Sequence, residues 1–239
     1  MQTSIAAITA EKAMEIYQLL PQDCRLFDGL SKEDFPSALA FFDAKEAFFP
    51  KGTLIQSAGE PVTRFGVLLS GALHVFAYDV EGERMLMASV TAGESYGESL
   101  CYLRAEESPV YVEATENAHL LLLSTDALRH PSACTPLDEL LSCRFTAMLA
   151  DKILHMNNRV QILSKRTLRK KLLAFFTQCV YQANGDREFT IPFDRAGLAD
   201  YLGADRTALS RELSAMKKEG IIDFSRSRFS LSKKHNFPL

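Results

Sequence analysis

The stretch Phe193–Leu231 constrains the fold of this 239-residue chain most, because it combines helix-capping residues, helical apolar spacing and glycines. Asp194 stands where an N-cap belongs, and the short apolar segment after it ends at Gly203, a residue type that adopts a left-handed backbone without penalty. Asp205 is a second N-cap, and a second helix is predicted to follow it and to end at Gly220. Two short helices with so short a turn between them must cross steeply. The segment therefore predicts a helix-turn-helix, and the residues after it predict a β-hairpin wing.

The second of these helices has one apolar and one polar face. Leu209, Leu213 and Met216 recur at i, i+4 and i+7 and form the inward stripe. The polar residues that face away from it near the N-terminal end are Arg206, Thr207, Ser210 and Arg211. Arginine pairs with two acceptors of guanine, and serine and threonine reach phosphates or base edges. The pattern predicts a recognition helix for the major groove of DNA, with a helical hairpin of solvated arginines as the alternative.

Further basic residues flank the predicted recognition face. Lys217 and Lys218 end the second helix, and Arg226 and Arg228 lie in the wing, so all four are predicted to contact DNA phosphates. A basic run at residues 165–171 is either a further phosphate contact or a solvated helix face.

Charge divides unevenly along the chain, although the net charge is only −3. Residues 164–239 hold 15 Lys and Arg against 8 Asp and Glu, whereas residues 1–163 hold 12 against 22. A basic C-terminal third is what phosphate binding by one domain produces. No apolar run is long enough to span a membrane and no signal sequence is evident, so we expect a cytoplasmic protein without a membrane partner. The five scattered cysteines, Cys24, Cys101, Cys134, Cys143 and Cys179, do not predict a disulfide framework.

A β-rich region is predicted between Ala47 and Ser124. Short β-branched and aromatic runs are separated there by glycines, which favours an antiparallel barrel or jelly roll. Hairpin turns are predicted at Ser70-Gly71 and Glu81-Gly82. Before this region, we expect short helices over Leu26–Ala47 and a mobile or helical lead-in over residues 1–24. The roll is interpreted as an effector sensor, with a purely structural dimer platform as the alternative.

The region after Pro136 is predicted to be helical to about residue 183. Within it, an apolar seam has spacings of 4, 3, 4 and 3, formed by Leu149, Ile153, Met156, Val160 and Leu163. The seam predicts a parallel coiled-coil homodimer, with packing against the chain's own barrel as the alternative, for which Leu140, Leu141 and Phe145 are better placed. The predicted domains are a sensing roll with its lead-in (1–136), a dimerisation helix (137–163) and a winged helix-turn-helix (164–239), with a hinge near Leu163-Ser164.

From about Leu26 to Leu231 the chain resembles the Crp/Fnr superfamily of bacterial transcription factors. The order K-G-x-L-I, G-V-L-L-S-G-A-L and A-G-E-S-Y-G-E is similar to the cyclic-nucleotide-binding β-roll of that family. The resemblance implies an α+β fold, with an antiparallel β-roll, a long dimerisation helix and a winged helix-turn-helix. It implies that Arg211 and Arg206 read bases in a palindromic operator on double-stranded DNA, with RNA polymerase as a further partner. The glutamate usual between these arginines is Thr207 here.

The predicted effector site centres on the segment Tyr96, Gly97, Glu98 and Ser99, where backbone N–H groups can face an anion. By resemblance, Gly97 and Glu98 match the phosphate-cassette glycine and the glutamate that holds a ribose hydroxyl. The cyclic-nucleotide binders then carry an Arg-Ser pair, where this chain has Ser108-Pro109. We therefore expect a small-molecule effector other than cyclic AMP. The second wall of its site is expected near Asp151–Met156 of the long helix, including Lys152 and Ile153.

Metal chemistry and catalysis are not predicted. Cys24 alone lies where an iron–sulfur member carries a cysteine cluster, and His74 is a lone strand histidine, so no metal, haem or iron–sulfur cluster is expected. A jelly-roll dioxygenase needs two histidines and a carboxylate, but His74 and His119 lack an H-x-D/E pair. The chain is predicted not to be an enzyme. The alternative function is an effector-binding module whose basic tail docks a protein or membrane surface.

Overall fold

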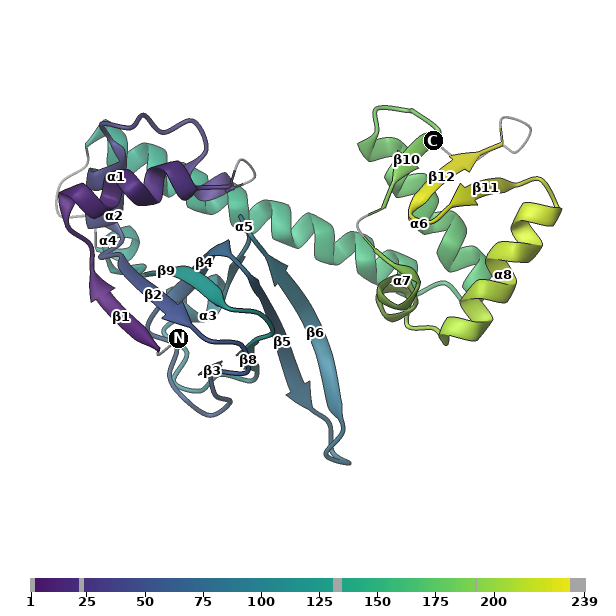
Figure 1. Ribbon diagram of the computed structural model, residues 1–239, viewed down its shortest axis with the longest axis horizontal. Helices are drawn as coiled ribbons and strands as arrows, with labels where there is room; N and C mark the ends of the chain where they lie inside the picture. The colour runs from purple at the N-terminus through teal and green to yellow at the C-terminus, as the bar shows by residue number, and fades with distance from the viewer. Residues whose placement is uncertain (1–2, 22–23, 131–134, 192, 233–239) are drawn as a thin grey trace. The chain divides into compact units, whose positions relative to one another are not determined.

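The computed structural model describes residues 3–21, 24–130, 135–191 and 193–232 and forms two compact units, Met1–Ala150 and Asp151–Leu239 (Figure 1). The long helix α5 (Pro136–Leu163) begins in the first unit and ends in the second. The predicted α+β class, with an antiparallel roll, a long helix and a winged helix-turn-helix, is confirmed. The functional division at 136 and 163 stays a prediction, and Cys134 lies outside the described residues.

Two antiparallel sheets form the roll of the first unit. One has the strand order β1-β2-β9-β4-β7, and the other has the order β3-β8-β5-β6. The strands of the first sheet are β1 (Ser4–Ala7), β2 (Lys45–Phe49), β4 (Phe65–Ser70), β7 (Ser95–Tyr96) and β9 (Ala118–Leu123). Those of the second are β3 (Leu54–Gln56), β5 (Ala72–Tyr78), β6 (Arg84–Thr91) and β8 (Tyr111–Ala114). Short helices connect or cover them: α1 (Ala10–Leu19), a 3-10 turn (Arg25–Phe27), α2 (Phe35–Phe41), α3 (Glu98–Tyr102) and α4 (Asp126–Arg129).

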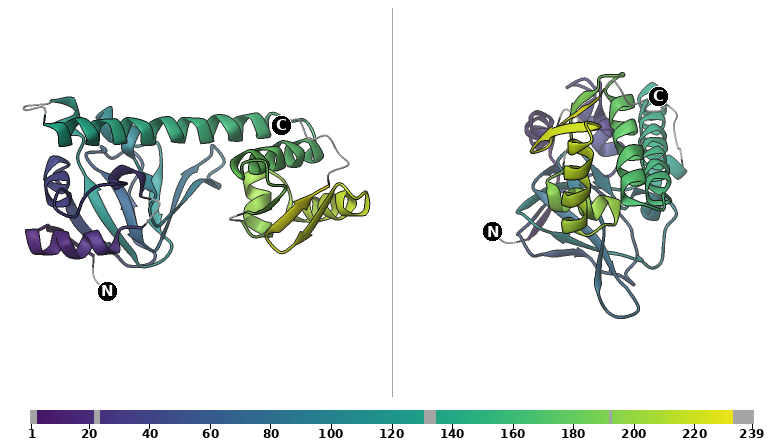
Figure 2. Two further views of the ribbon diagram at one scale, coloured as in Figure 1. Left: turned by 90° about the horizontal axis from the view of Figure 1, so that it is seen from above. Right: turned by 90° about the vertical axis from the view of Figure 1, so that its right-hand side faces the viewer.

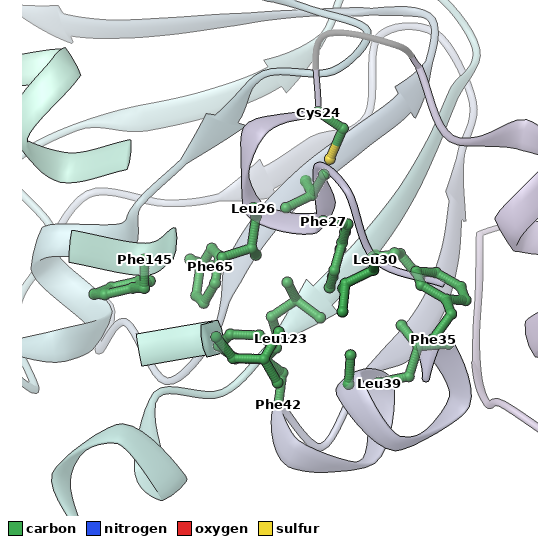
Figure 3. Packing of buried hydrophobic residues seen from close by; sticks show 14 of the residues in the cluster. Cys24, Leu26, Phe27, Leu30, Phe35, Leu39, Phe42, Phe65, Leu123 and Phe145 are labelled. Atoms are coloured by element: carbon green, nitrogen blue, oxygen red, sulfur yellow. The ribbon is translucent and has the colours of Figure 1, made fainter. Parts of the chain in front are cut away.

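Strand β4 is buried on both faces from Phe65 to Leu69, and only its last residue, Ser70, is exposed. Successive strand side chains point to opposite faces, so Phe65, Val67 and Leu69 join one core while Leu68 joins another. The first core fills the space between the five-stranded sheet, α1, α2 and the start of α5, and the second lies between the two sheets. Figure 3 shows the first core, in which phenylalanine rings such as Phe65 and Phe145 meet edge to face at 5.7 Å. Phe145 thereby anchors the first half of α5 to the roll.

The prediction of a hairpin at Ser70-Gly71 is wrong. Strands β4 and β5 flank this dipeptide but belong to different sheets, so the chain turns a corner there. Gly71 has φ of +94°, and a Cβ at this residue would lie 2.3 Å from the backbone oxygen of Asn117. Glycine is therefore required by close backbone approach as well as by conformation. The hairpin predicted at Glu81-Gly82 is confirmed, since β5 and β6 pair antiparallel on either side of it.

The N-terminal segment is more than a lead-in. Its strand β1 pairs with β2 and extends the five-stranded sheet, which the sequence did not predict. The helix α1 buries Ala13 and Ile16 in the first core. The helical range predicted over Leu26–Ala47 ends too late, because its last three residues already belong to β2.

The second unit contains the end of α5, then α6 (Leu168–Gln182), α7 (Arg195–Leu202) and α8 (Arg206–Lys218). Its sheet has the order β10-β12-β11, formed by β10 (Glu188–Thr190), β11 (Ile222–Ser225) and β12 (Arg228–Leu231). The β11–β12 hairpin is the predicted wing, and β10 is an additional strand. The helix predicted to run from Pro136 to about residue 183 is broken at residues 164–167, where the hinge was expected, and Thr167 caps α6.

Candidate nucleic-acid interface

Both predicted helix caps of the helix-turn-helix are confirmed. Asp194 accepts a hydrogen bond from the backbone N–H of Gly197 at 2.7 Å and so begins α7. Asp205 begins α8, where its Oδ1 accepts from the N–H groups of Thr207 at 2.8 Å and Ala208 at 2.9 Å. These bonds favour the ionised carboxyl, the Ala208 bond most, and lower the pKa of Asp205. Between the helices, Gly203 adopts the left-handed backbone that the turn needs, with φ of +56°.

The apolar stripe of α8 fixes which of its faces meets solvent. Leu209, Leu213 and Met216 are each 0% exposed. They pack in the core of the second unit together with buried residues of α6, α7 and the wing, among them Phe176, Leu198, Leu202, Ile222 and Phe229. Because one side of the helix is held so completely, the opposite side must face outward.

That outward side of α8 is a shallow, open depression in the protein surface, which is called the groove of α8 below. It is lined by Thr207, Ser210, Arg211, Ser214, Ala215 and Lys218. Four residues predicted to contact DNA therefore share one face: Thr207, Ser210, Arg211 and Lys218. Ser214 and Ala215 were not predicted, although the spacing of three and four residues from Arg211 would have placed them there. The groove lining offers hydroxyl, guanidinium and ammonium groups and no carboxylate, which suits phosphate oxygens and base-edge acceptors.

The other four predicted contacts do not line this groove. Arg206 is exposed in the first turn of α8, and Arg226 has a positive φ of 53° in the turn of the wing. Lys217 pairs through its Nζ with Oδ1 of Asp223 at 2.5 Å, and Arg228 pairs with Glu188 at 3.0 Å.

The basic run at 165–171 is partly engaged within the second unit. Lys171 donates from Nζ to the carbonyl oxygen of Leu202 at 2.8 Å. Arg169 pairs with Glu212 of α8 and with Glu219, the C-cap residue of that helix. These two side chains support the helix-turn-helix from α6.

The predicted effector residues before residue 110 lie in the roll. Tyr96 is buried at the end of β7, and burial raises the pKa of its hydroxyl. Gly97 is the N-cap of the short helix α3, where Glu98 is buried and Ser99 is exposed. Ser108 and Pro109 come about ten residues later in the chain. Ser108 is buried and Pro109 is exposed.

The surroundings of Ser108 matter because an arginine would be needed there for a cyclic phosphate. Its hydroxyl donates to the carbonyl oxygen of Val110 at 2.8 Å and accepts from the N–H of Val110 at 3.3 Å. Its backbone N–H donates to the carbonyl oxygen of Glu60. Arg104, the nearest basic residue in the sequence, pairs with Asp126 at 3.1 Å. Ser108 thus serves a local turn, and Arg104 is held by a different partner.

Lys152 and Ile153 belong to the second unit, on α5. Ile153 is exposed and Lys152 is partly buried. The role predicted for them at the effector site stays a prediction.

The metal-ligating residue types are dispersed. In the described ranges, no group of three or more His, Cys, Asp or Glu is placed to hold a metal ion. His74 lies on β5, whereas His119 on β9 is buried and bonds Glu46 at 2.8 Å. Cys101 is also buried, with its Sγ 3.4 Å from the carbonyl oxygen of Thr63. Across the same described ranges, no helix is long and apolar enough to cross a membrane.

An antiparallel roll, a long helix and a winged helix-turn-helix with an outward basic face form the architecture of a DNA-binding transcriptional regulator with a separate N-terminal domain. Comparison with known families gives the same two parts. The family described as "Cyclic nucleotide-binding domain" matches residues 46–130, and the "Crp-like helix-turn-helix domain" matches residues 170–234. The chain belongs to the Crp/Fnr superfamily of transcriptional regulators.

Individual relatives are distant. The chain is 25% identical over 197 residues to the "Cyclic AMP receptor protein" of Thermus thermophilus. The matched region covers 82% of this chain and 87% of that protein. A solved structure of CprK complexed with OCPA has a TM-score of 0.64 at 18% identity, covering 83% of this chain and 89% of that one. The c-di-GMP-responsive regulator CLP of Xanthomonas campestris has a TM-score of 0.58 at 14% identity, covering 84% and 99%. At these identities the two structures show the fold alone.

Proposed function

We propose that the protein is a homodimer that reads a palindromic operator on double-stranded DNA and responds to a small-molecule effector other than cyclic AMP. The observation that carries the proposal is the two-sided helix α8, whose apolar stripe is fully buried and whose outward face carries Arg211 beside hydroxyl groups. Arg211 is proposed to read guanine, with Arg206, Thr207 and Ser210 beside it and Lys218 on the phosphates. The proposed place of action is the cytoplasm, and transcriptional control implies RNA polymerase as a further partner.

Exposure along α5 supports the proposed dimer. Three of its seam residues, Ile153, Met156 and Val160, are 57%, 68% and 63% exposed, and Leu163 is 38% exposed. Leu149, the seam residue four positions before Ile153, packs at the edge of the first core. Consecutive exposed apolar side chains on one helix face are costly in water, and a second copy of the helix would cover them. Figure 2 shows α5 as one continuous helix that could carry such a seam.

A two-fold axis along this seam would set the form of the operator. Two recognition helices related by that axis contact two half-sites one helical turn apart, and the half-sites must then be inverted copies. The proposed operator is therefore a palindrome.

The effector is proposed to differ from cyclic AMP because Ser108 stands where the cyclic-nucleotide binders carry an arginine, and Arg104 pairs with Asp126. A buried phosphate without a counter-charge costs several kcal/mol, which removes useful affinity. Calorimetry with cyclic AMP on the full chain tests this, and micromolar binding would contradict it. Mass spectrometry of molecules retained by the natively purified protein is the direct route to the effector.

Lys152 and Ile153 of α5 stay proposed effector-binding residues. Ile153 belongs to the proposed dimer seam and Lys152 is its neighbour, so effector binding by them would be coupled to dimerisation and so to the spacing of the two recognition helices. Substitution of either residue should change effector-dependent DNA binding. Unchanged dependence in both variants would count against the coupling.

The experiment that tests DNA reading is selection from a library of random duplexes by the full chain. An enriched palindrome is the expected result. The absence of any enriched duplex would refute the proposal, and binding to vesicles or to a protein surface in its place would support the docking alternative.

A further inference from the structure

The side chain of Arg169, in the first turn of α6, joins that helix to α8 at two points. Its Nε donates to Oε1 of Glu212 at 2.6 Å. Its Nη1 and Nη2 donate to Oε2 and Oε1 of Glu219 at 2.8 and 2.6 Å, which is a two-pronged pair. Such fork-shaped pairs fix the relative orientation of both groups, unlike a single contact between flexible chains.

The two glutamates lie beside the DNA-facing groove and not in it. Glu212 lies on α8, and Glu219, seven residues later, is the C-cap residue of that helix, so both lie on one flank, and neither belongs to the groove lining. On α8 and at its cap, the third carboxylate, Asp205, accepts backbone N–H groups. Each of these three carboxylates thus has a partner within the second unit. A glutamate free to swing toward the groove would repel phosphates.

The opposite flank of α8 is held as well. Lys217 pairs with Asp223 of β11, and its Nζ lies 5.1 Å from the ring centroid of Phe224. The helix is therefore fixed by an apolar stripe below, by Arg169 on one flank and by the wing on the other. Apolar packing alone is non-directional, whereas the ion pairs define how far the helix is rotated and shifted along its axis.

We infer that Arg169 is a positioning residue for base reading. It acts through Glu212 and Glu219, setting the orientation of α8 and holding both carboxylates away from the groove, and it does not contact a phosphate. The inference rests on the proposed DNA-reading function. It reverses the interpretation suggested by the basic run at 165–171, in which Arg169 would be one more phosphate contact.

Two variants of the full chain, Arg169→Lys and Glu219→Gln, distinguish positioning of α8 by Arg169 from contact of Arg169 with a phosphate. Arg169→Lys keeps the positive charge but loses the fork, so a phosphate contact would survive the change and a positioning contact would not. The probes are the duplex that the wild-type protein enriches from a random library and a random duplex of the same length. We expect Arg169→Lys to weaken binding to the enriched duplex by roughly 2- to 30-fold, with binding to the random duplex and the salt dependence unchanged.

For Glu219→Gln, the positioning role and the phosphate-contact role predict different changes in DNA-binding affinity. It should lower the ratio of enriched-duplex to random-duplex affinity if Arg169 positions α8. If Arg169 contacts phosphate, losing the competing carboxylate should strengthen binding to both duplexes. The matched control is Lys170→Arg, which makes the reverse exchange in the same turn and should leave the ratio unchanged.

A measurement without DNA completes the test. Amide hydrogen exchange in α8 should be faster in Arg169→Lys and Glu219→Gln than in the wild-type protein and Lys170→Arg. Wild-type exchange and wild-type affinity ratios in both variants would overturn the inference. If the wild-type protein enriches no duplex, the proposed DNA reading fails, and the exchange measurement still decides whether Arg169 holds α8.

Discussion

Val160→Glu is the sharpest test of the proposed dimer. Val160 lies in the seam of α5 and is 63% exposed in the protomer. Exposed positions tolerate substitution with changes within about 0.5 kcal/mol, so the fold of the protomer should survive. In a dimer the same position would be buried against its copy, and the two carboxylates would approach each other. Association should therefore be lost without loss of folding.

The size of the effect follows from the exposed fraction. Full burial of such a side chain contributes about 1.5–3 kcal/mol, so covering the exposed part would contribute about 1–2 kcal/mol. The two-fold axis doubles this, to about 2–4 kcal/mol for the pair of valines. At about 1.4 kcal/mol for each factor of ten, the dimer dissociation constant should rise by about 30- to 700-fold. Repulsion between the two carboxylates adds to this value.

Sedimentation equilibrium over a range of concentrations measures the dissociation constant, and circular dichroism verifies the helices. The matched control is Leu154→Glu, because Leu154 is 61% exposed on the same helix but lies one residue outside the seam. It should associate like the wild-type protein. The reasoning is refuted if Val160→Glu associates as tightly as the wild-type protein, or if Leu154→Glu is weakened to the same extent.

Three further outcomes are expected from the second unit. Arg211→Ala should cost about 1–3 kcal/mol of binding free energy on a selected duplex, with little change on random DNA. Lys218→Ala should weaken binding to both duplexes alike and reduce the slope of log affinity against log salt concentration by about 1. Equal losses on both duplexes for Arg211→Ala would exclude Arg211 from base reading. Leu213→Ala should lower the free energy of unfolding in urea by about 2–5 kcal/mol, because its side chain is 0% exposed, and a loss below about 1 kcal/mol would contradict that packing. The lowered pKa of Asp205 means that its contribution to stability is complete above the ordinary value of 3.8 and is lost as the pH falls through its folded-state pKa. Asp205→Asn keeps a capping oxygen without the charge, so urea unfolding between about pH 3 and pH 6 should show a shallower acid loss than in the wild-type protein; an identical pH dependence would contradict this.

Local patterns in the sequence were enough to predict the helix-turn-helix. Asp194, Gly203 and Asp205 each act within a few residues of their own position, through a cap or a left-handed turn. The stripe of Leu209, Leu213 and Met216 follows from helical periodicity, and all three are buried. These features need no partner from a distant part of the chain. The sequence also predicted the β5–β6 hairpin, whose two strands are neighbours along the chain.

Features that depend on distant partners were missed or misread. The corner at Gly71 looks like a hairpin turn, because the sequence does not reveal that the next strand joins another sheet. Strand β1 and strand β10 are short, and each becomes a strand only through a partner far along the chain, as in the pairing of Phe189 with Phe229. Arg169 reads as part of a basic run until the fold brings it to Glu212 and Glu219, which lie 43 and 50 residues away.

The sequence by itself therefore determined the kind of protein, a two-part regulator with a DNA-reading helix, because capping, periodicity and turn chemistry are local. Tertiary structure alone decided which basic side chains are held by carboxylates. Arg169, Lys217 and Arg228 are paired in this way, whereas Arg211 and Lys218 line the open groove. The physical reason is that the charge of a side chain is fixed by its type, but its partner is fixed by whatever the folded chain places within a few ångströms of it.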